Sequence, residues 1–246
     1  MHIPFAKTDI PFIDTYQMRE VDRMMIQDYR IELIQMMENA GRNLAHLART
    51  RFFNGEPKGK RLIVLAGTGG NGGGVLVCAR HLHNWGVQVY VVIARPAGEF
   101  TPVAGHQLEI LHRLKISILP AHKVDQVEVP NLIIDGLIGY SLKGAPRGSI
   151  ADLIQWANSQ SAAILALDAP SGLDTSTGKL YHPTIKAAAT MTLALPKEGL
   201  RAPDAKDYVG ELYLADISVP PSLYKKPRLA MEIGALFSES EVIRLW

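Results

Sequence analysis

A glycine-rich segment at residues 67–74 constrains the fold of this chain more than any other feature. Its eight residues hold six glycines, and they join an apolar run at residues 62–66 to a helical pattern. Glycine permits positive φ angles and lets the backbone approach a ligand closely. A strand that leads through such a loop into a helix forms an anion site from backbone N–H groups. The segment also fits G-x-G-x-x-G at Gly67, Gly69 and Gly72. It therefore predicts an α/β fold with a turn that holds a nucleotide or dinucleotide.

The rest of the chain alternates between short apolar runs and amphipathic stretches. Continuous apolar runs are typical of strands buried in a parallel sheet, and the stretches between them have the helical period. This alternation predicts an α/β fold, a Rossmann-like three-layer αβα sandwich with a mostly parallel central sheet. Strands are expected at residues 62–66, 87–94, 116–119, 132–134, 163–167, 188–195 and 211–215, the last of which ends the sheet. Helices are expected at residues 15–29, 31–53, 72–84, 101–114, 149–159 and 183–187.

The sequence predicts a single domain over residues 1–246. Residues 1–53 form a helical lead-in, the α/β core covers about residues 60–220, and residues 221–246 are a C-terminal extension. A chain of 246 residues can bury a large core without disulfides.

An ordinary composition excludes several classes of protein. The net charge is +2 and long Lys/Arg runs are absent, so a nucleic-acid partner is not expected. The single cysteine, Cys78, excludes an intramolecular disulfide and a cysteine-rich metal site. The N-terminus lacks a signal-peptide pattern, and apolar runs stay well short of the roughly 20 residues that a membrane helix needs. We therefore expect a cytoplasmic protein that does not bind membranes.

Polar side chains gather where the predicted strands end. Asn71 lies in the glycine loop, Asp135 and Asp168 directly follow apolar strands, and Ser171 comes three residues later. In open α/β sheets, ligands bind beyond the carboxyl ends of the strands, where we expect the two aspartates to lie half out of water near the other two side chains. Their oxygen atoms suit an alkali or alkaline-earth cation, or general acid/base chemistry. Each residue alone is equally explained as a helix cap or turn residue, but together they favour a site.

Other chemistries have little support in the sequence. A nucleophile elbow, a P-loop and metal-binding histidine spacings are all absent. A conventional NAD dehydrogenase places an acidic residue roughly 20 positions beyond its glycines, whereas the strand at residues 87–94 is followed by Arg95. Arg95 suits the 2′-phosphate of NADP, although a solvated loop arginine is the commoner explanation. A conventional NADP oxidoreductase is a further alternative, but the chain lacks a Tyr-x-x-x-Lys hydride-transfer pair.

Five segments in the same order resemble the YjeF N-terminal-domain family. They are residues 37–42, the glycine loop, the segment that begins at Asp135, residues 168–174 and residues 195–200, and the resemblance extends over about residues 15–220. It implies a Rossmann-like NAD(P)HX epimerase, an isomerase that interconverts the R and S hydrates of NADH or NADPH for cofactor repair. It also implies a potassium ion beside the site, a homodimer, and a separate NAD(P)HX dehydratase as functional partner.

The resemblance also implies roles for individual residues. Asp168 is the catalytic acid/base and contacts the substrate, whereas Asn71, Asp135 and Ser171 are the potassium ligands. Lys197 belongs to a Pro-Lys pair that recurs in the family, and we assign no role to it from the sequence. The substrate-binding residues are Gly70, Asn71, Gly72, Gly73, Gly74 and Asp168, together with Gly139, Tyr140, Ser141, Leu142, Lys143, Gly144 and Ala145 of a loop that holds the dinucleotide phosphates.

The glycine loop departs from the family pattern. The usual loop is Asn-Asn-Gly-Gly-Asp-Gly, whereas residues 70–75 are Gly-Asn-Gly-Gly-Gly-Val. Gly70 and Gly74 thus replace an amide and a carboxylate, Val75 replaces a glycine, and Tyr140 stands where the family usually has threonine. These changes keep a second function open: a non-catalytic nucleotide-binding or RNA-processing-related dimerisation module on the same fold.

Overall fold

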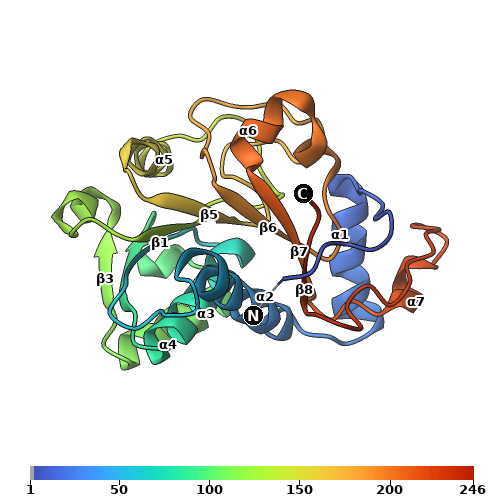
Figure 1. Cartoon of the computed structure of the whole chain (residues 1–246), viewed down its shortest axis with the longest axis horizontal. Helices are drawn as coiled ribbons and strands as arrows, with labels where there is room; N and C mark the ends of the chain where they lie inside the picture. The colour runs from blue at the N-terminus through green and yellow to red at the C-terminus, as the bar shows by residue number, and fades with distance from the viewer. Residues whose placement is uncertain (1–2) are drawn as a thin grey trace.

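One twisted sheet organises the chain (Figure 1). A computed structural model describes residues 3–246; Met1 and His2, where the predicted lead-in begins, lie outside the described residues. Within that range the sheet has eight strands in the order β3-β2-β1-β4-β5-β6-β7-β8. The first seven are parallel, and β8 runs antiparallel to β7. The strands are β1 (Arg61–Ala66), β2 (Gln88–Ile93), β3 (Ser117–Pro120), β4 (Leu132–Gly136), β5 (Ala163–Leu167), β6 (Ala189–Leu193), β7 (Glu211–Ala215) and β8 (Val242–Arg244).

Helices cover both faces of the sheet and give the predicted three layers. They are α1 (Thr15–Arg23), α2 (Leu33–Leu47), α3 (Gly70–Asn84), α4 (Pro102–Arg113), α5 (Ser149–Ser159), α6 (Lys206–Val209) and α7 (Pro221–Tyr224). Short turns of π-helix, η1 (Met24–Asp28) and η2 (Ala48–Phe52), continue α1 and α2, and short 3₁₀ turns are η3 (Ala97–Glu99), η4 (Ala121–Gln126), η5 (Glu198–Arg201) and η6 (Pro203–Ala205). Among residues 3–246, none of these helices is long and apolar enough to cross a membrane.

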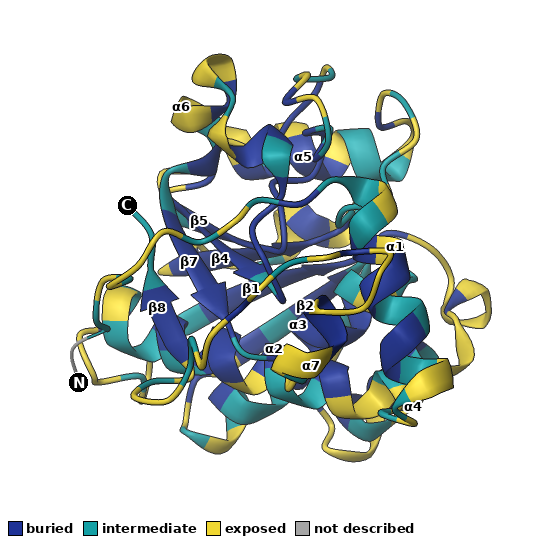
Figure 2. Cartoon of the chain, turned by 90° about the vertical axis from the view of Figure 1, so that its right-hand side faces the viewer, coloured by how far each residue is buried: buried dark blue, intermediate teal, exposed yellow. Residues whose placement is uncertain are grey.

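Alternating side chains of the strands build two cores. Leu62 and Val64 of β1 face α2, α3 and α4, whereas Ile63 and Leu65 face α5 and η4. Figure 1 accordingly shows α2, α3 and α4 on one side of the sheet and α5 on the other. In Figure 2 the strands are almost wholly buried, and exposed residues gather on outer helical turns and loops. The uninterrupted apolar runs of the sequence thus correspond to strands buried on both faces.

Two predicted elements differ from the structure. The expected helix at residues 183–187 is absent, because the backbone N–H groups of Ile185 and Ala187 donate to Ser171 and Tyr208 instead of forming helical bonds. The strand at residues 211–215 does not end the sheet, since β8 pairs with it from within the C-terminal extension. A three-residue strand is too short for a recognisable period, which is why the sequence pattern missed it.

The contact between α2 and α3 is unusually close at Gly41. A Cβ atom on Gly41 would lie 2.4 Å from Val77 Cβ and 2.5 Å from the carbonyl oxygen of Gly74. Only a residue without a side chain lets α2 pack this near the first turns of α3. The contact therefore sets the distance between α2 and the glycine loop.

Gly41→Ala should destabilise the protein by about 1–3 kcal/mol, because the added methyl group overlaps fixed backbone and a buried side chain. Gly98→Ala is the matched control, since a Cβ at that position meets no atom within 4 Å. Urea denaturation measures both free energies of unfolding. Equal losses in the two variants would contradict the close-packing explanation.

Candidate active site

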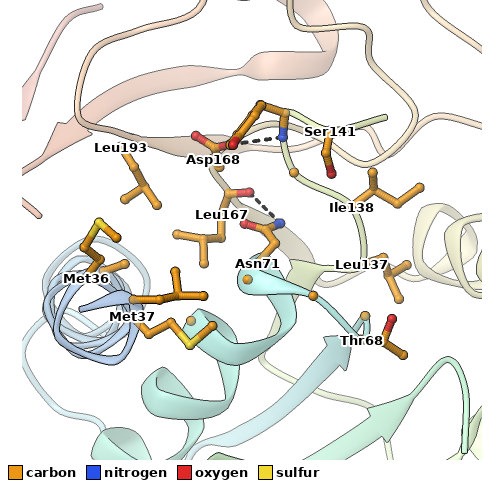
Figure 3. A pocket seen from close by; sticks show the side chains of 18 of the residues that line it. Met36, Met37, Thr68, Asn71, Leu137, Ile138, Ser141, Leu167, Asp168 and Leu193 are labelled. Carbon is orange, nitrogen blue, oxygen red and sulfur yellow. Dashed lines mark hydrogen bonds between the residues drawn. The ribbon is translucent and has the colours of Figure 1, made fainter. Parts of the chain in front are cut away.

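A cavity of about 480 Å³ opens at the carboxyl ends of β1, β4 and β5. Figure 3 shows Asn71 at the start of α3 and Asp168 after β5 on one side, with Met36 and Met37 of α2 on the other. The predicted site residues that line this cavity are Gly70, Asn71, Gly74, Gly139, Tyr140, Ser141 and Asp168. Those that do not line it are Gly72, Gly73, Leu142, Lys143, Gly144, Ala145, Asp135 and Ser171.

The glycine loop is held by backbone packed on backbone. A Cβ on Gly67 would lie 2.0 Å from the carbonyl oxygen of Leu137, and one on Gly72 would lie 1.8 Å from that of Gly67. The loop thus joins the end of β1 to the segment after β4. The helix α3 then begins at Gly70 without a side-chain cap, which leaves its first N–H groups for a ligand or water.

Three elements converge at Gly139. The Asn71 Nδ2 atom donates a 3.0 Å hydrogen bond to the carbonyl oxygen of Leu167, which fixes the amide (Figure 3). A Cβ on Gly139 would lie 3.2 Å from Asn71 Cγ and 3.3 Å from Asp168 Oδ2. Residues from α3, the segment after β4 and the end of β5 are therefore within one small group of atoms.

A buried ion pair holds the predicted catalytic carboxylate. The Nζ atom of Lys197 lies 2.5 Å from Asp168 Oδ1 and also donates to the carbonyl oxygen of Leu193 at 2.8 Å. The other oxygen, Asp168 Oδ2, accepts from the backbone N–H of Tyr140 at 3.1 Å. Asp168 has a φ of 66°, a strained conformation for a residue with a side chain that is common at functional sites. Lys197, unassigned from the sequence, is thus the partner of Asp168.

A second carboxylate, Asp22 of α1, also lines the cavity. The Tyr140 hydroxyl donates a short 2.5 Å hydrogen bond to Asp22 Oδ2. Burial raises the pKa of Asp22, and burial together with this carboxylate raises that of Tyr140. Sequence reasoning missed Asp22, although a signal existed. It lies among Met18 and Val21 of α1 and Met25 of η1, on a buried face where a charged residue is unexpected.

The prediction that Asp135 and Asp168 lie half out of water is wrong, because Asp168 is only 4% exposed and Asp135 is less exposed still. Asp135 belongs to β4 and is fully buried. Its Oδ1 accepts from Ser171 Oγ at 2.7 Å and from the backbone N–H of Leu137 at 3.1 Å, and its Oδ2 accepts from the backbone N–H of Ser171 at 2.8 Å. These partners are all neutral, and burial raises the pKa of Asp135 to about 6.

The departures in the glycine loop have local explanations. A Cβ on Gly74 would lie 2.7 Å from Leu167 Cδ2, so Leu167 occupies the space of a side chain at position 74. Val75 fits because Gly136 on β4 has no side chain. A Cβ atom on Gly136 would lie 2.4 Å from the two methyl groups of Val75. Around Gly70 there is open space. The departures at Gly74 and Val75 thus have apolar neighbours, and the one at Gly70 lies in open space.

An open sheet with a glycine loop and a cavity at its carboxyl edge is the arrangement of the Rossmann-like folds that bind nucleotides. Within that class the chain belongs to the family described as YjeF-related protein N-terminus, which matches residues 33–199. The resemblance found in the sequence is therefore confirmed.

Relatives and a solved structure agree with this assignment. The chain is 42% identical to the NAD(P)H-hydrate epimerase of Dehalogenimonas lykanthroporepellens, over 86% of this chain and 84% of that one. It is 31% identical to the NAD(P)H-hydrate epimerase of Rhodopirellula baltica, over 88% of each chain. The bifunctional NAD(P)H-hydrate repair enzyme Nnr of Salinibacter ruber is 32% identical over 96% of this chain, which spans only 46% of its length. The crystal structure of yeast ynu0 (YNL200c) shares the fold, with a TM-score of 0.82 at 24% identity, covering 96% of this chain and 100% of that one.

Asp22→Asn should change how stability depends on pH. Burial raises the pKa of Asp22 in the folded protein above its usual 3.8. At a pH between the unfolded and the folded pKa, the folded protein therefore keeps a proton that the unfolded chain has released. The wild-type free energy of unfolding should therefore fall, relative to the variant, as pH rises through this window. The asparagine keeps an acceptor for Tyr140, so the hydrogen bond is preserved. Urea denaturation from about pH 4 to pH 7 measures the difference, and a constant difference would contradict the raised pKa.

Proposed function

We propose that this protein is an NAD(P)H-hydrate epimerase, an isomerase that interconverts the R and S hydrates of NADH and NADPH for cofactor repair. The observation that carries the proposal is the buried Asp168–Lys197 pair in the wall of the cavity that the glycine loop also lines. Two relatives at 42% and 31% identity, matched over most of their length, bear that name. They favour an enzyme over a non-catalytic module on the same fold.

The reaction inverts one carbon atom and needs proton transfer at the oxygen bound to it. Water adds to a dihydronicotinamide at the ring carbon beside the nitrogen, because protonation of the enamine makes that carbon electrophilic. To invert this centre, the C–O bond breaks, the nitrogen lone pair forms a C=N bond, and the oxygen takes a proton and leaves as water. A water molecule then adds to the opposite face and loses a proton. No net oxidation occurs, and one group that gives and takes a proton is sufficient when the planar iminium ring turns its other face toward that group before water adds.

In this proposal Asp168 is that group. Its carboxyl gives a proton to the leaving oxygen and takes one from the entering water. The Lys197 ammonium group, 2.5 Å from Oδ1, shares this proton with the carboxyl between the two transfers. The Tyr140 N–H keeps Oδ2 in place. A carboxylate fixed in a buried site also stabilises the positive charge that develops on the ring, at little reorganisation cost.

The remaining predicted residues provide binding. We propose that residues 70–74 and residues 139–145 surround the dinucleotide, that the first N–H groups of α3 donate to it, and that its nicotinamide end lies toward Asp168. The single domain over residues 1–246 and a homodimer are part of the same proposal. A functional partnership with an NAD(P)HX dehydratase is supported by the bifunctional relatives, which are named as repair enzymes.

A potassium ion fits the oxygen atoms that the resemblance assigns to it. Asp135 is a buried carboxylate with neutral partners only, and a monovalent cation would supply the missing charge. The nitrogen of the Asn71 amide donates a hydrogen bond to the carbonyl oxygen of Leu167, so the amide oxygen points away from Leu167. Asn71, Asp135 and Ser171 offer only hard oxygen ligands, and residues 3–246 contain no cluster of three or more His, Cys, Asp or Glu that suits another metal. Bound there, potassium would neutralise Asp135 and order the segment after β4.

The epimerase proposal predicts that Asp168→Asn slows catalysis by about 10²- to 10⁴-fold. R-NADHX is supplied with a dehydratase specific for the S form, and recovery of NADH is followed with potassium present. Asp174→Asn is the control, because Asp174 only caps a turn through the N–H groups of Ser176 and Thr177. If the wild-type protein gives no acceleration over spontaneous epimerisation, the proposal fails.

The potassium proposal predicts a rise in Tm when KCl replaces tetramethylammonium chloride at equal ionic strength. Binding to the folded state alone stabilises it by mass action, and each kcal/mol raises Tm by about 2–4 °C. Asp135→Asn should abolish the rise, whereas Asp174→Asn should keep it. Differential scanning calorimetry makes the measurement, and a rise of the same size in both variants would argue against a cation at Asp135.

A further inference from the structure

We infer that Arg95 and the cavity behind it form a subsite for an adenosine 2′-phosphate, so that this protein prefers the hydrate of NADPH to that of NADH. The preference rests on the proposed function, whereas the subsite itself can be tested by ligand binding, which needs no epimerase activity.

The sheet places Arg95 beside the glycine loop. β1 pairs with β2 in parallel, with Ala66 opposite Ile93, and Arg95 follows two residues after β2 ends. In a dinucleotide-binding sheet of this strand order, the end of the second strand meets the adenosine ribose. Asp168 follows β5, three strands away from β2 in the sheet. Three strand spacings are about 14 Å, a separation that an extended dinucleotide bridges.

The backbone before Arg95 is fixed from two sides. The N–H of Ala94 donates to the carbonyl oxygen of Ala66 at 3.0 Å. The hydroxyl of Ser149, the first residue of α5, donates to the carbonyl oxygen of Ala94 at 2.6 Å. The guanidinium of Arg95 is therefore carried by an anchored strand end that α5 also contacts.

Arg95 is available to an anion. It is exposed, and within residues 3–246 its side chain forms no ion pair or hydrogen bond. It is also the one basic residue in the described part of the chain that lines the site cavity, since Lys197 is buried against Asp168. A guanidinium donates two parallel hydrogen bonds to a phosphate, and an acidic residue at this position would repel one.

A second cavity of about 610 Å³ lies next to Arg95. Ala94 and Arg95 line both cavities, so these two residues lie between them. Its walls come from the end of β2, the segment around η4, and α5, and they include the apolar side chains of Val124, Leu153 and Trp156. Asp125 and Asp152 line it too, and their oxygens can accept hydrogen bonds from an amino group. Flat apolar walls with acceptors suit an adenine ring, with the 2′-phosphate left at Arg95.

Binding of two small probes tests the subsite directly. Isothermal titration calorimetry should show that adenosine 2′,5′-bisphosphate binds at least about 10-fold more tightly than AMP, because charged hydrogen bonds contribute about 10- to 100-fold. Arg95→Ala should abolish this difference. Arg113→Ala is the matched control, an exposed arginine of α4 that pairs with Glu109, and it should keep the difference. Equal affinities of the two probes for the wild-type protein, or a difference that survives Arg95→Ala, would overturn the subsite.

The kinetic arm tests the preference. The wild-type kcat/KM should be at least about 10-fold higher for R-NADPHX than for R-NADHX, and Arg95→Ala should lower this ratio by about 10- to 100-fold, mainly through KM. Arg95→Glu should favour NADHX. Equal kcat/KM values in the wild-type protein overturn the preference. If the probes distinguish the 2′-phosphate but neither hydrate is epimerised, the proposed function fails and the subsite stands.

Discussion

The close backbone contact among Gly67, Gly72 and Leu137 is the constraint on which the rest of the site depends. It places the end of β1, the start of α3 and the segment after β4 at van der Waals distance from one another. Asn71 then reaches the end of β5, and the N–H of Tyr140 reaches Asp168. A side chain at Gly67 or Gly72 would separate these segments, and the polar groups would no longer converge.

The site stabilises two buried carboxylates in different ways. Asp168 has a cationic partner, Lys197, while Asp135 has three neutral donors from Ser171 and Leu137. An isolated buried charge is costly, so each arrangement has its own consequence. The pair at Asp168 keeps a carboxylate and an ammonium group together at the wall of the cavity, whereas Asp135 is surrounded by neutral donors only.

Most of the fold was predictable because its strands are buried on both faces. The apolar runs at 163–167 and 211–215 and the helix at 149–159 coincide with β5, β7 and α5, since such patterns depend only on local sequence. The strand β8 and the irregular segment at 183–187 depend on partners far along the chain. For the same reason the sequence identified Asp168 but not its contact with Lys197, and it missed Asp22, which becomes part of the site only because α1 packs beside Tyr140.

The side chain of Leu167 has a consequence for how this site can change over evolutionary time. Because the Cδ2 methyl group of Leu167 lies beside Gly74, an aspartate at position 74 requires Leu167 to move or to become smaller. Neighbouring substitutions of this kind are not additive, so the order in which they arise matters. Val75 and Gly136 are coupled in the same way. The residues tolerated at positions 74 and 136 thus depend on the side chains at 167 and 75, so these positions are expected to change in pairs.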